Sequence, residues 1–269
     1  MGILNVTPDS FSDGGCFDSL GAAVAHAEKM ISEGADILDI GGESTRPATF
    51  ENTEPLSEEN ECRRILPVIQ EIARRFPETP LSIDTYKAKV AESAIAYGAV
   101  MLNDISAFRA DPLMLELAVR CQVPTCLMHL LGLPKAIPLK PHYEDVVAEV
   151  KEHLRAQADL AVRAGFAREN IILDPGFGFG KTVQNNLALL KRLRELVELG
   201  YPVLMGTSRK STIGRVLGDL PPQERLEGTA ATVALSIVYG ASIVRVHDVK
   251  EMARVVKMSV AVINGWEEE

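Results

Sequence analysis

A run of glycines and aromatic residues between a carboxylate and a lysine is the part of this sequence that most clearly indicates chemistry. Residues 171–181 read IILDPGFGFGK. The three aliphatic residues are typical of a strand buried on both faces, and Pro175 ends that strand directly after Asp174. The glycines permit close approach of the backbone to a ligand, while Phe177 and Phe179 offer flat apolar surfaces. The run predicts a site for a planar ligand with polar edges; a flexible turn with incidental aromatic residues is the alternative.

Two nucleotide-binding motifs are excluded in this run. Residues 180–182 (GKT) end like a phosphate-binding loop, but Pro175 stands where that motif requires its first glycine. Lys181 stands where the dinucleotide-binding motif requires its third glycine. The sequence therefore predicts neither nucleotide fingerprint.

A second set of polar residues follows other apolar runs and has the character of a heterocycle-binding site. Asp84, Asn103 and Asp174 supply acceptors and donors, and Lys210 adds a cation. Such a set matches the amide and amino edges of a fused nitrogen heterocycle. A buried ion pair of Lys210 with Asp174, serving structure alone, is the alternative. Because buried charge pairs stabilise proteins only weakly, the functional interpretation is favoured.

A separate group of residues suits an anion and a metal ion. Arg245 and His247 lie two residues apart in an expected strand, and they could hold a phosphate, the arginine by paired hydrogen bonds. Asn5 is a hard oxygen donor suited to Mg²⁺, although a turn-initiating role before residues 7–9 is the better interpretation of this residue in isolation. For His129 and His142 a structural role is favoured.

These residues must be positioned by a regular alternation of apolar runs and amphipathic segments. The expected strands are 2–6, 36–40, 81–83, 100–102, 124–128, 171–173, 202–205 and 242–246. The expected helices are 20–32, 58–75, 87–97, 112–121, 143–164, 185–199, 222–239 and 249–263. Glycines close several of these helices, namely Gly34, Gly98, Gly165, Gly200 and Gly240.

Eight strand–helix units without a flexible linker predict a single domain over residues 1–269, an α/β (β/α)8 TIM barrel. A doubly wound open sheet is the alternative. In a barrel the functional groups gather at the carboxyl ends of the strands, where the polar residues named above fall. Long loops follow the first two strands, at 7–19 and 43–57. Loops of this length are usually functional and suggest lids, with disordered surface loops as the alternative.

Composition narrows the classes of protein that fit. Of the 269 residues 46% are hydrophobic, which is enough for a large core, and the net charge of −9 argues against a nucleic-acid or membrane-surface binder. No apolar run is long enough to cross a membrane, and no signal peptide is recognised. The four cysteines lack metal-binding spacing and suggest free thiols in the cytoplasm.

The motifs, taken together and in order, resemble dihydropteroate synthases. They are MGILNVTPDSFSDGG (1–15), GGESTRP (41–47), SIDT (82–85), LNDI (102–105), LDPGFGFGK (173–181), SRKS (208–211) and RVHD (245–248). The resemblance implies a TIM barrel that forms a homodimer. It implies condensation of 6-hydroxymethyl-7,8-dihydropterin diphosphate with 4-aminobenzoate to 7,8-dihydropteroate and diphosphate in folate biosynthesis. It also implies inhibition by sulfonamides, which imitate the aminobenzoate.

The resemblance also implies roles for individual residues. Catalytic roles fall to Asp84, Asp174, Lys210 and Arg245. Pterin binding falls to the same four residues and Asn103. Diphosphate binding falls to Arg245, His247 and Asn5, with Asn5 as the Mg²⁺ ligand. Aminobenzoate binding falls to Thr45, Arg46, Pro47, Phe179, Lys210 and Ser211, and the first mobile loop contributes Asp9, Phe11, Ser12 and Asp13.

The implied mechanism is an SN1-like loss of Mg²⁺-bound diphosphate. A carboxylate at the pterin ring stabilises the developing positive charge, and the arylamine then attacks the cation. A pterin-dependent methyltransferase domain is one alternative, but it does not need the SRKS and RVHD cations. A non-catalytic pterin-binding paralogue is another, and it would be expected to have lost charged positions that are all present here.

Overall fold

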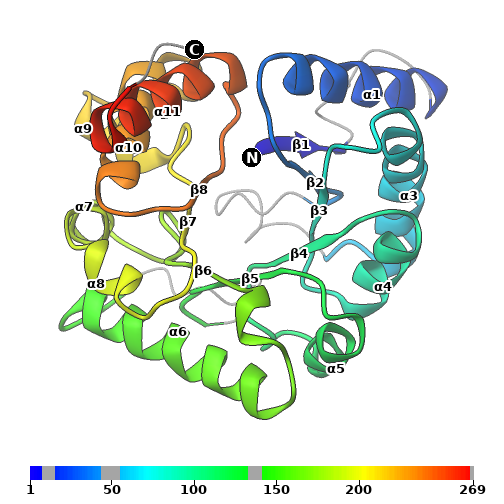
Figure 1. The fold of residues 1–269 in the computed structure, drawn as a ribbon, viewed down its shortest axis with the longest axis horizontal. Helices are drawn as coiled ribbons and strands as arrows, with labels where there is room; N and C mark the ends of the chain where they lie inside the picture. Colours follow the sequence, from blue (N-terminus) through cyan, green and yellow to red (C-terminus); the bar gives the residue numbers. More distant parts are fainter. Residues whose placement is uncertain (8–15, 44–54, 133–140, 267–269) are drawn as a thin grey trace.

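The computed structural model of the protein describes residues 1–7, 16–43, 55–132 and 141–266. Strands and helices alternate along this chain, and the helices form a ring around the strands (Figure 1). The strands are β1 (Gly2–Asn5), β2 (Leu38–Gly41), β3 (Leu81–Asp84), β4 (Met101–Asp104), β5 (Thr125–Met128), β6 (Ile171–Asp174), β7 (Leu204–Met205) and β8 (Ile243–Val244). The helices are α1 (Cys16–Ser32), α3 (Glu58–Arg75), α4 (Ala88–Ala96), α5 (Pro112–Cys121), α6 (Val146–Arg163), α7 (Val183–Lys191), α8 (Arg194–Val197), α9 (Ser211–Val216), α10 (Leu226–Val238) and α11 (Val249–Asn264), with short 3₁₀ turns at Arg168–Asn170 and Pro222–Glu224.

The strands close into a barrel. β1 to β6 pair in sequence order, all parallel, and β7 pairs with β8. Single parallel bridges join the two groups, Leu173 to Val203 on one side and Gly2 to Val246 on the other. At the second junction the Ile3 N–H donates to the Val246 carbonyl at 3.0 Å. The predicted (β/α)8 barrel is therefore confirmed, and the open doubly wound sheet is excluded because its end strands would not meet.

Two apolar layers form because successive strand residues point to opposite sides. Outward residues such as Leu38 and Ile40 pack against α3 residues such as Ile65 and Ile69 in the main core. The amino-terminal part of the barrel interior has a core of its own, made of Met1, Ile37, Met101, Cys126, Ile172, Leu204 and Ile243. Two residues further along four of these strands, on the same inward face, stand Asp39, Asn103, Asp174 and Arg245. The interior therefore changes from apolar to charged toward the carboxyl ends.

Local signals explain several helix ends. Asp145 begins α6 by accepting hydrogen bonds from the N–H groups of Val147 and Ala148. The side chain of Thr182 and that of Asn185 form a capping box at α7. The five glycines expected to close helices all have positive φ, which confirms that prediction.

Several expected elements have different bounds in the structure. The helix expected over 185–199 is divided into α7 and α8, and Arg192 at the junction pairs instead with Glu195 and Asp145. The helix expected from Pro222 begins at Leu226, after a 3₁₀ turn. β7 and β8 have only two residues each.

The short helix α9 was not expected. It begins at the last residue of the polar SRKS motif, and it contains Gly214, which packs against the Arg225 guanidinium. It therefore lacks the apolar periodicity from which helices are recognised.

Within the described ranges, no helix is both long and apolar enough to cross a bilayer. Cys62, Cys121 and Cys126 are free thiols, as expected, and the side chain of Cys16 lies outside the described part. The assignment of residues 1–269 to a single domain stays a prediction.

Candidate active site

Four inward positions lie at one level near the carboxyl ends of the first strands. The parallel register pairs Asn5 with Gly41, Gly41 with Asp84, and Asp84 with Asn103. A Cβ atom at Gly41 would lie 3.8 Å from Oδ1 of Asn5 and 3.6 Å from Cβ of Asp84. The missing side chain therefore lets the Asn5 and Asp84 side chains approach each other across β2.

Arg245 reaches across the barrel to this level. Its Nη2 donates to Asp84 Oδ2 at 2.7 Å, and its Nε donates to Asp39 Oδ2 at 2.5 Å. The Asn103 amide also donates to Asp39 Oδ2, at 3.0 Å. These four residues, which we name the central cluster, join β8 to β2, β3 and β4.

The central cluster and the adjacent Ser82 carry buried oxygen atoms that lack hydrogen-bond partners. Asp39 Oδ1, Asp84 Oδ1 and the hydroxyl of Ser82 have no hydrogen-bond partner among the described residues. Ser82 pairs with Asp39 in register and precedes Asp84 by two residues on the same face. A buried polar atom left unpaired costs about 1–3 kcal/mol. The arrangement therefore suits a ligand that presents N–H donors to carboxylates.

Electrostatics at the carboxyl end of the barrel show how desolvated these groups are. Burial raises the pKa of Asp84, although the charge of Arg245 lowers it. Burial also raises the pKa of Asp174, while the Gly176 N–H and the charge of Lys210 lower it. Burial works against the charge of Arg245, but Asp39 and Asp84 outweigh it and hold the pKa of Arg245 above its usual range. Arg245 therefore stays charged, and proton exchange at this level falls to the carboxyl groups.

The glycine-rich loop brings Lys210 over an aromatic ring. The Lys210 ammonium lies 3.9 Å from the centroid of the Phe179 ring. Gly178 has a φ of +83°, and a Cβ atom there would lie 2.9 Å from the Lys210 side chain. Both rings are buried, but Phe177 packs against Leu190 and its neighbours, away from Phe179, which packs with Met128 and Leu130. The expectation that both phenylalanines face the ligand is therefore wrong for Phe177, because the loop turns one ring inward to fill the space under α7.

Lys181 closes the same loop. Its ammonium contacts Nδ1 of His129 at 3.0 Å and donates to the carbonyls of Gly176 and Phe179, each at 3.0 Å. Burial lowers the pKa of His129 to about 2, so the ring is neutral and can accept this bond. His129 thus has the structural role that the sequence favours, and Lys181 ties the loop to it.

The SRKS and RVHD motifs are bound to each other. Ser208 Oγ accepts the His247 N–H at 3.1 Å and lies 3.0 Å from His247 Nδ1. The Arg209 guanidinium forms a two-point ion pair with Asp248, with Nε 2.9 Å from Oδ2. The two loops after β7 and β8 are therefore held as one surface.

The contacts add to one grouping inferred from the sequence. Arg245, which is predicted to hold an anion together with His247, also pairs with Asp39 and Asp84, because the barrel turns the inward side of β8 toward β2 and β3.

Sequence reasoning missed Asp39. The signal that was available is a carboxylate within an apolar strand, at an inward position two residues before a glycine. Its arginine partner lies 206 positions away and could not be inferred from spacing.

Several expected site residues lie outside the described residues. They are Asp9, Phe11, Ser12 and Asp13 of the first long loop, and Thr45, Arg46 and Pro47 of the second. Ser211 is described; it is exposed and begins α9 next to Lys210.

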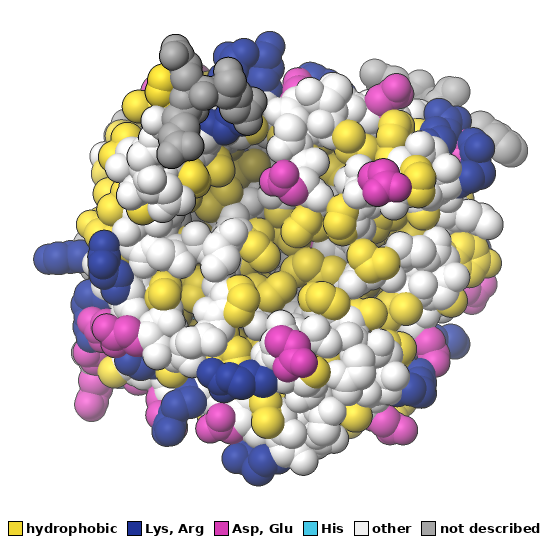
Figure 2. Space-filling view, viewed as in Figure 1, with side chains coloured by type: hydrophobic (Ala, Val, Ile, Leu, Met, Phe, Trp, Pro, Cys, Tyr) yellow, Lys and Arg dark blue, Asp and Glu magenta, His cyan; other side chains and the backbone are white. Residues whose placement is uncertain are grey.

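A cavity of about 780 Å³ lies elsewhere, at the amino-terminal ends of β1, β2 and β8 beside α11. It is lined by apolar residues such as Met1, Ile243 and Met252. In Figure 2, hydrophobic side chains gather across the middle of the face drawn there. We place the site instead at the carboxyl ends, where the desolvated charges and unpaired acceptors lie.

Comparison with known proteins identifies the family. The family model of pterin binding enzymes matches residues 1–247. The dihydropteroate synthase of Bacillus subtilis is 51% identical over 264 residues, covering 98% of this chain and 88% of that protein. The chain belongs to the dihydropteroate synthase family.

Solved dihydropteroate synthases have the same fold. The Xanthomonas albilineans dihydropteroate synthase with 4-aminobenzoic acid is 44% identical and has a TM-score of 0.90, covering 98% of this chain and 92% of that one. The Yersinia pestis enzyme in a sulfonamide drug complex is 43% identical and also has a TM-score of 0.90, covering 99% and 94% of the two chains.

Proposed function

We propose that the protein condenses 6-hydroxymethyl-7,8-dihydropterin diphosphate with 4-aminobenzoate to give 7,8-dihydropteroate and diphosphate, a step of folate biosynthesis. The observation that carries the proposal is the central cluster, a set of buried carboxylate oxygens with unpaired acceptor capacity at the carboxyl end of the barrel. A relative that is 51% identical over nearly the whole chain supports it.

The pterin would be held by Asp84, Asn103, Asp174 and Lys210. The carboxylates would accept the ring N–H groups, and Lys210 with Phe179 would cover a ring face. In their ionised form, the desolvated carboxylates of Asp84 and Asp174 would act strongly on positive charge that develops at the pterin when the C–O bond breaks. Burial raises both pKa values and opposes ionisation, while the charge of Arg245, which donates to Asp84, favours the ionised form.

The diphosphate would leave from the side of Asn5, Arg245 and His247. The Asn5 amide oxygen suits Mg²⁺, which takes few protein oxygens when a substrate phosphate and waters complete its shell. No group of three His, Cys, Asp or Glu side chains in the described ranges is placed to hold an ion, so such a site would rest on Asn5, substrate and water. Bound Mg²⁺ would neutralise charge on the leaving diphosphate.

The 4-aminobenzoate would lie beside Phe179, Lys210 and Ser211, with Thr45, Arg46 and Pro47 completing its site. The first three residues are contributed by neighbouring loops, and Ser211 follows Lys210 directly. Sulfonamides would compete at this position, as the drug complex of the Yersinia pestis relative suggests. The loop residues Asp9, Phe11, Ser12 and Asp13 would shape the closed site.

The protein is also proposed to form a homodimer in the cytoplasm. Adjacent helices α10 and α11 expose large apolar side chains that a partner copy would cover, namely Leu235, Val238, Met258 and Val262, and the exposed Trp266 follows α11. The free thiols fit a reducing compartment. No nucleic-acid or membrane partner is proposed.

The deciding experiment is formation of dihydropteroate from dihydropterin diphosphate and labelled 4-aminobenzoate, with and without Mg²⁺. Product that requires Mg²⁺ and is suppressed by a sulfonamide is the expected result. Pterin binding without product would contradict the proposal and favour a non-catalytic pterin-binding protein. Methyl transfer from a folate donor would favour the methyltransferase instead.

A further inference from the structure

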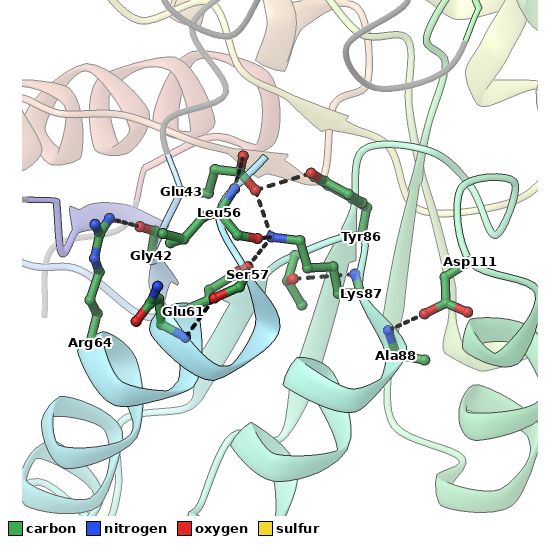
Figure 3. A network of polar contacts seen from close by, with 12 residues as sticks. Gly42, Glu43, Leu56, Ser57, Glu61, Arg64, Tyr86, Lys87, Ala88 and Asp111 are labelled. Carbon is green, nitrogen blue, oxygen red and sulfur yellow. Dashed lines mark hydrogen bonds and ion pairs between the residues drawn. The ribbon is translucent and has the colours of Figure 1, made fainter. Parts of the chain in front are cut away.

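A second buried charge cluster lies outside the barrel, beside the end of β2 (Figure 3). Its centre is Lys87, which precedes α4. The Lys87 ammonium contacts Glu43 Oε2 at 2.7 Å, Glu61 Oε2 at 2.5 Å and the Leu56 carbonyl at 2.7 Å. Only 11% of the Lys87 side chain is exposed, and 1% of that of Glu61. We name Lys87, Glu43, Glu61 and Leu56 the lysine clamp.

The clamp joins two points that are separated along the chain by the second long loop. Glu43 follows β2, and Leu56 precedes α3, whose first turn Ser57 caps. The two points also contact each other, because the Leu56 N–H donates to Glu43 Oε1 at 3.1 Å. Lys87 thus fixes both points against the start of α4, and Figure 3 shows its ammonium directed at both of them.

The clamp differs from a ligand site because its acceptors are satisfied. Glu43 Oε2 also accepts from the Tyr86 hydroxyl at 3.0 Å. No side-chain oxygen of Glu43 or Glu61 is left buried without a partner. Burial alone would raise the pKa of Glu43, but the hydrogen bonds from Lys87, Leu56 and Tyr86 outweigh it and lower that pKa. A lysine ammonium with three acceptors has no proton to offer a substrate.

The distance between clamp and substrate residues along the chain is short. Thr45, Arg46 and Pro47 begin two residues after Glu43. Glu43, which the clamp holds, is therefore the described residue that precedes them most closely in the chain. Misplacement of substrate-contacting groups by about 1 Å can lower a rate by about a hundredfold.

We infer that Lys87 is a positioning residue for the aminobenzoate subsite, acting by holding Glu43 and Leu56 together at the two ends of the segment that carries Thr45, Arg46 and Pro47. The inference rests on the proposed synthase function. The three hydrogen bonds of the Lys87 ammonium all go to clamp residues, and none of them goes to the residues proposed to bind the pterin.

The test is a steady-state comparison of variants with both substrates. A Lys87→Met/Glu61→Gln double variant removes the cation together with one of its carboxylates, so that fewer buried charges are left unpaired. We expect the KM for 4-aminobenzoate to rise about tenfold or more, and the KM for dihydropterin diphosphate to change less than about twofold. Lys87→Arg keeps the charge with a different geometry, and we expect an intermediate rise; it carries the test if the double variant does not fold.

Glu92→Gln is the matched control. It removes an exposed ion pair between Glu92 in α4, the helix that Lys87 precedes, and Arg120 in α5. We expect both KM values to remain those of the wild type.

Two results would overturn the inference alone: equal rises in both KM values, or a lowered unfolding temperature with both KM values unchanged. Failure of the wild-type protein to form product would instead overturn the proposed function and, with it, this inference. The wild-type reaction therefore separates the two.

Discussion

The central cluster and the lysine clamp both bury a cation with two carboxylates, but they differ in whether every buried carboxylate oxygen has a hydrogen-bond partner. In the central cluster Arg245 pairs with Asp39 and Asp84 through one oxygen each, and the second oxygen of each carboxylate is unpaired. In the clamp, no carboxylate oxygen of Glu43 or Glu61 is buried without a hydrogen-bond partner. In both clusters the removal of the charges from water costs free energy. The comparison teaches that burial of charge marks a ligand site only where acceptor capacity remains.

The two cations suit these different tasks. The planar guanidinium of Arg245 bridges two carboxylates on neighbouring strands through Nε and Nη2. The ammonium of Lys87 directs single protons to acceptors from three separate segments. An arginine thus aligns two side chains for a ligand, while a lysine gathers chain segments to one point.

The largest effect is expected from removing the cation of the central cluster. Arg245→Met leaves Asp39 and Asp84 buried without a counter-charge, which costs about 3–5 kcal/mol of stability. Turnover should fall about a thousandfold or more, because the carboxylates then lose their orientation. Urea unfolding and product formation measure the two effects. Stability and turnover within error of the wild type would remove the distinction between the clusters.

Next in size is the loss of the cation over the Phe179 ring. Lys210→Ala should lower kcat about a hundredfold while the fold is retained, because the lysine contacts a ring at the site and is partly exposed. Asp174→Asn should act in the same way. Circular dichroism and single-turnover assays on both variants provide the check. Wild-type rates in either one would contradict the assigned roles.

Asp84→Asn is expected to separate function from stability. In the folded wild type, burial raises the pKa of the Asp84 carboxyl, so the folded state binds the carboxyl proton more tightly than the unfolded chain does. The stability that this proton contributes is complete below the ordinary pKa of aspartate, about 3.9, and is lost as pH rises through the raised pKa. The free energy of unfolding of the variant should therefore exceed that of the wild type by about 1–3 kcal/mol near pH 7. Near pH 3 the two free energies should be equal.

Denaturant unfolding at several pH values tests this, with turnover measured in parallel. We expect turnover to be lost despite the higher stability. A variant that is less stable than the wild type near pH 7, with a deficit that shrinks toward pH 3, would show that ionised Asp84 stabilises the fold, as ionised Glu43 does in the clamp.

The smallest effect is expected from removing the Tyr86 hydroxyl, which contacts the clamp residue Glu43. Tyr86→Phe removes one hydrogen bond to Glu43 and leaves the three Lys87 contacts in place. Stability should fall by about 0.5–1.5 kcal/mol, and the KM for 4-aminobenzoate should change less than about threefold. Thermal unfolding and steady-state kinetics measure both. A rise in this KM as large as that of the Lys87 variants would place the positioning role on Tyr86.

Much of the fold is predictable from the sequence because it depends on local periodicity. The alternation of apolar runs and amphipathic segments predicts all eight strands, and α3 and α5 begin and end at the predicted residues. The positive φ of five helix-closing glycines follows from the same kind of local signal. The helical break at Arg192 was not predictable, because the side chain pairs with Asp145, 47 residues earlier.

The candidate site was predictable only in part. Asp84, Asn103, Asp174 and Arg245 stand at expected strand ends, where parallel strands bring their carboxyl termini together. The fate of Phe177 was not predictable, because neither its type nor its spacing distinguishes it from Phe179. The same holds for Lys87, whose partners come from the ends of other elements.

The sequence by itself determined the alternation of strands and helices and which side chains point inward, since these depend on residue type and a period of two along each strand. Its motifs determined the family. Only the tertiary structure decided which inward charges meet. Arg245 contacts Asp39 and Asp84 across 206 and 161 positions because closure of the barrel brings β8 beside β1 and turns it toward β2 and β3. Such partners are set by the register of the whole ring, which no local pattern contains.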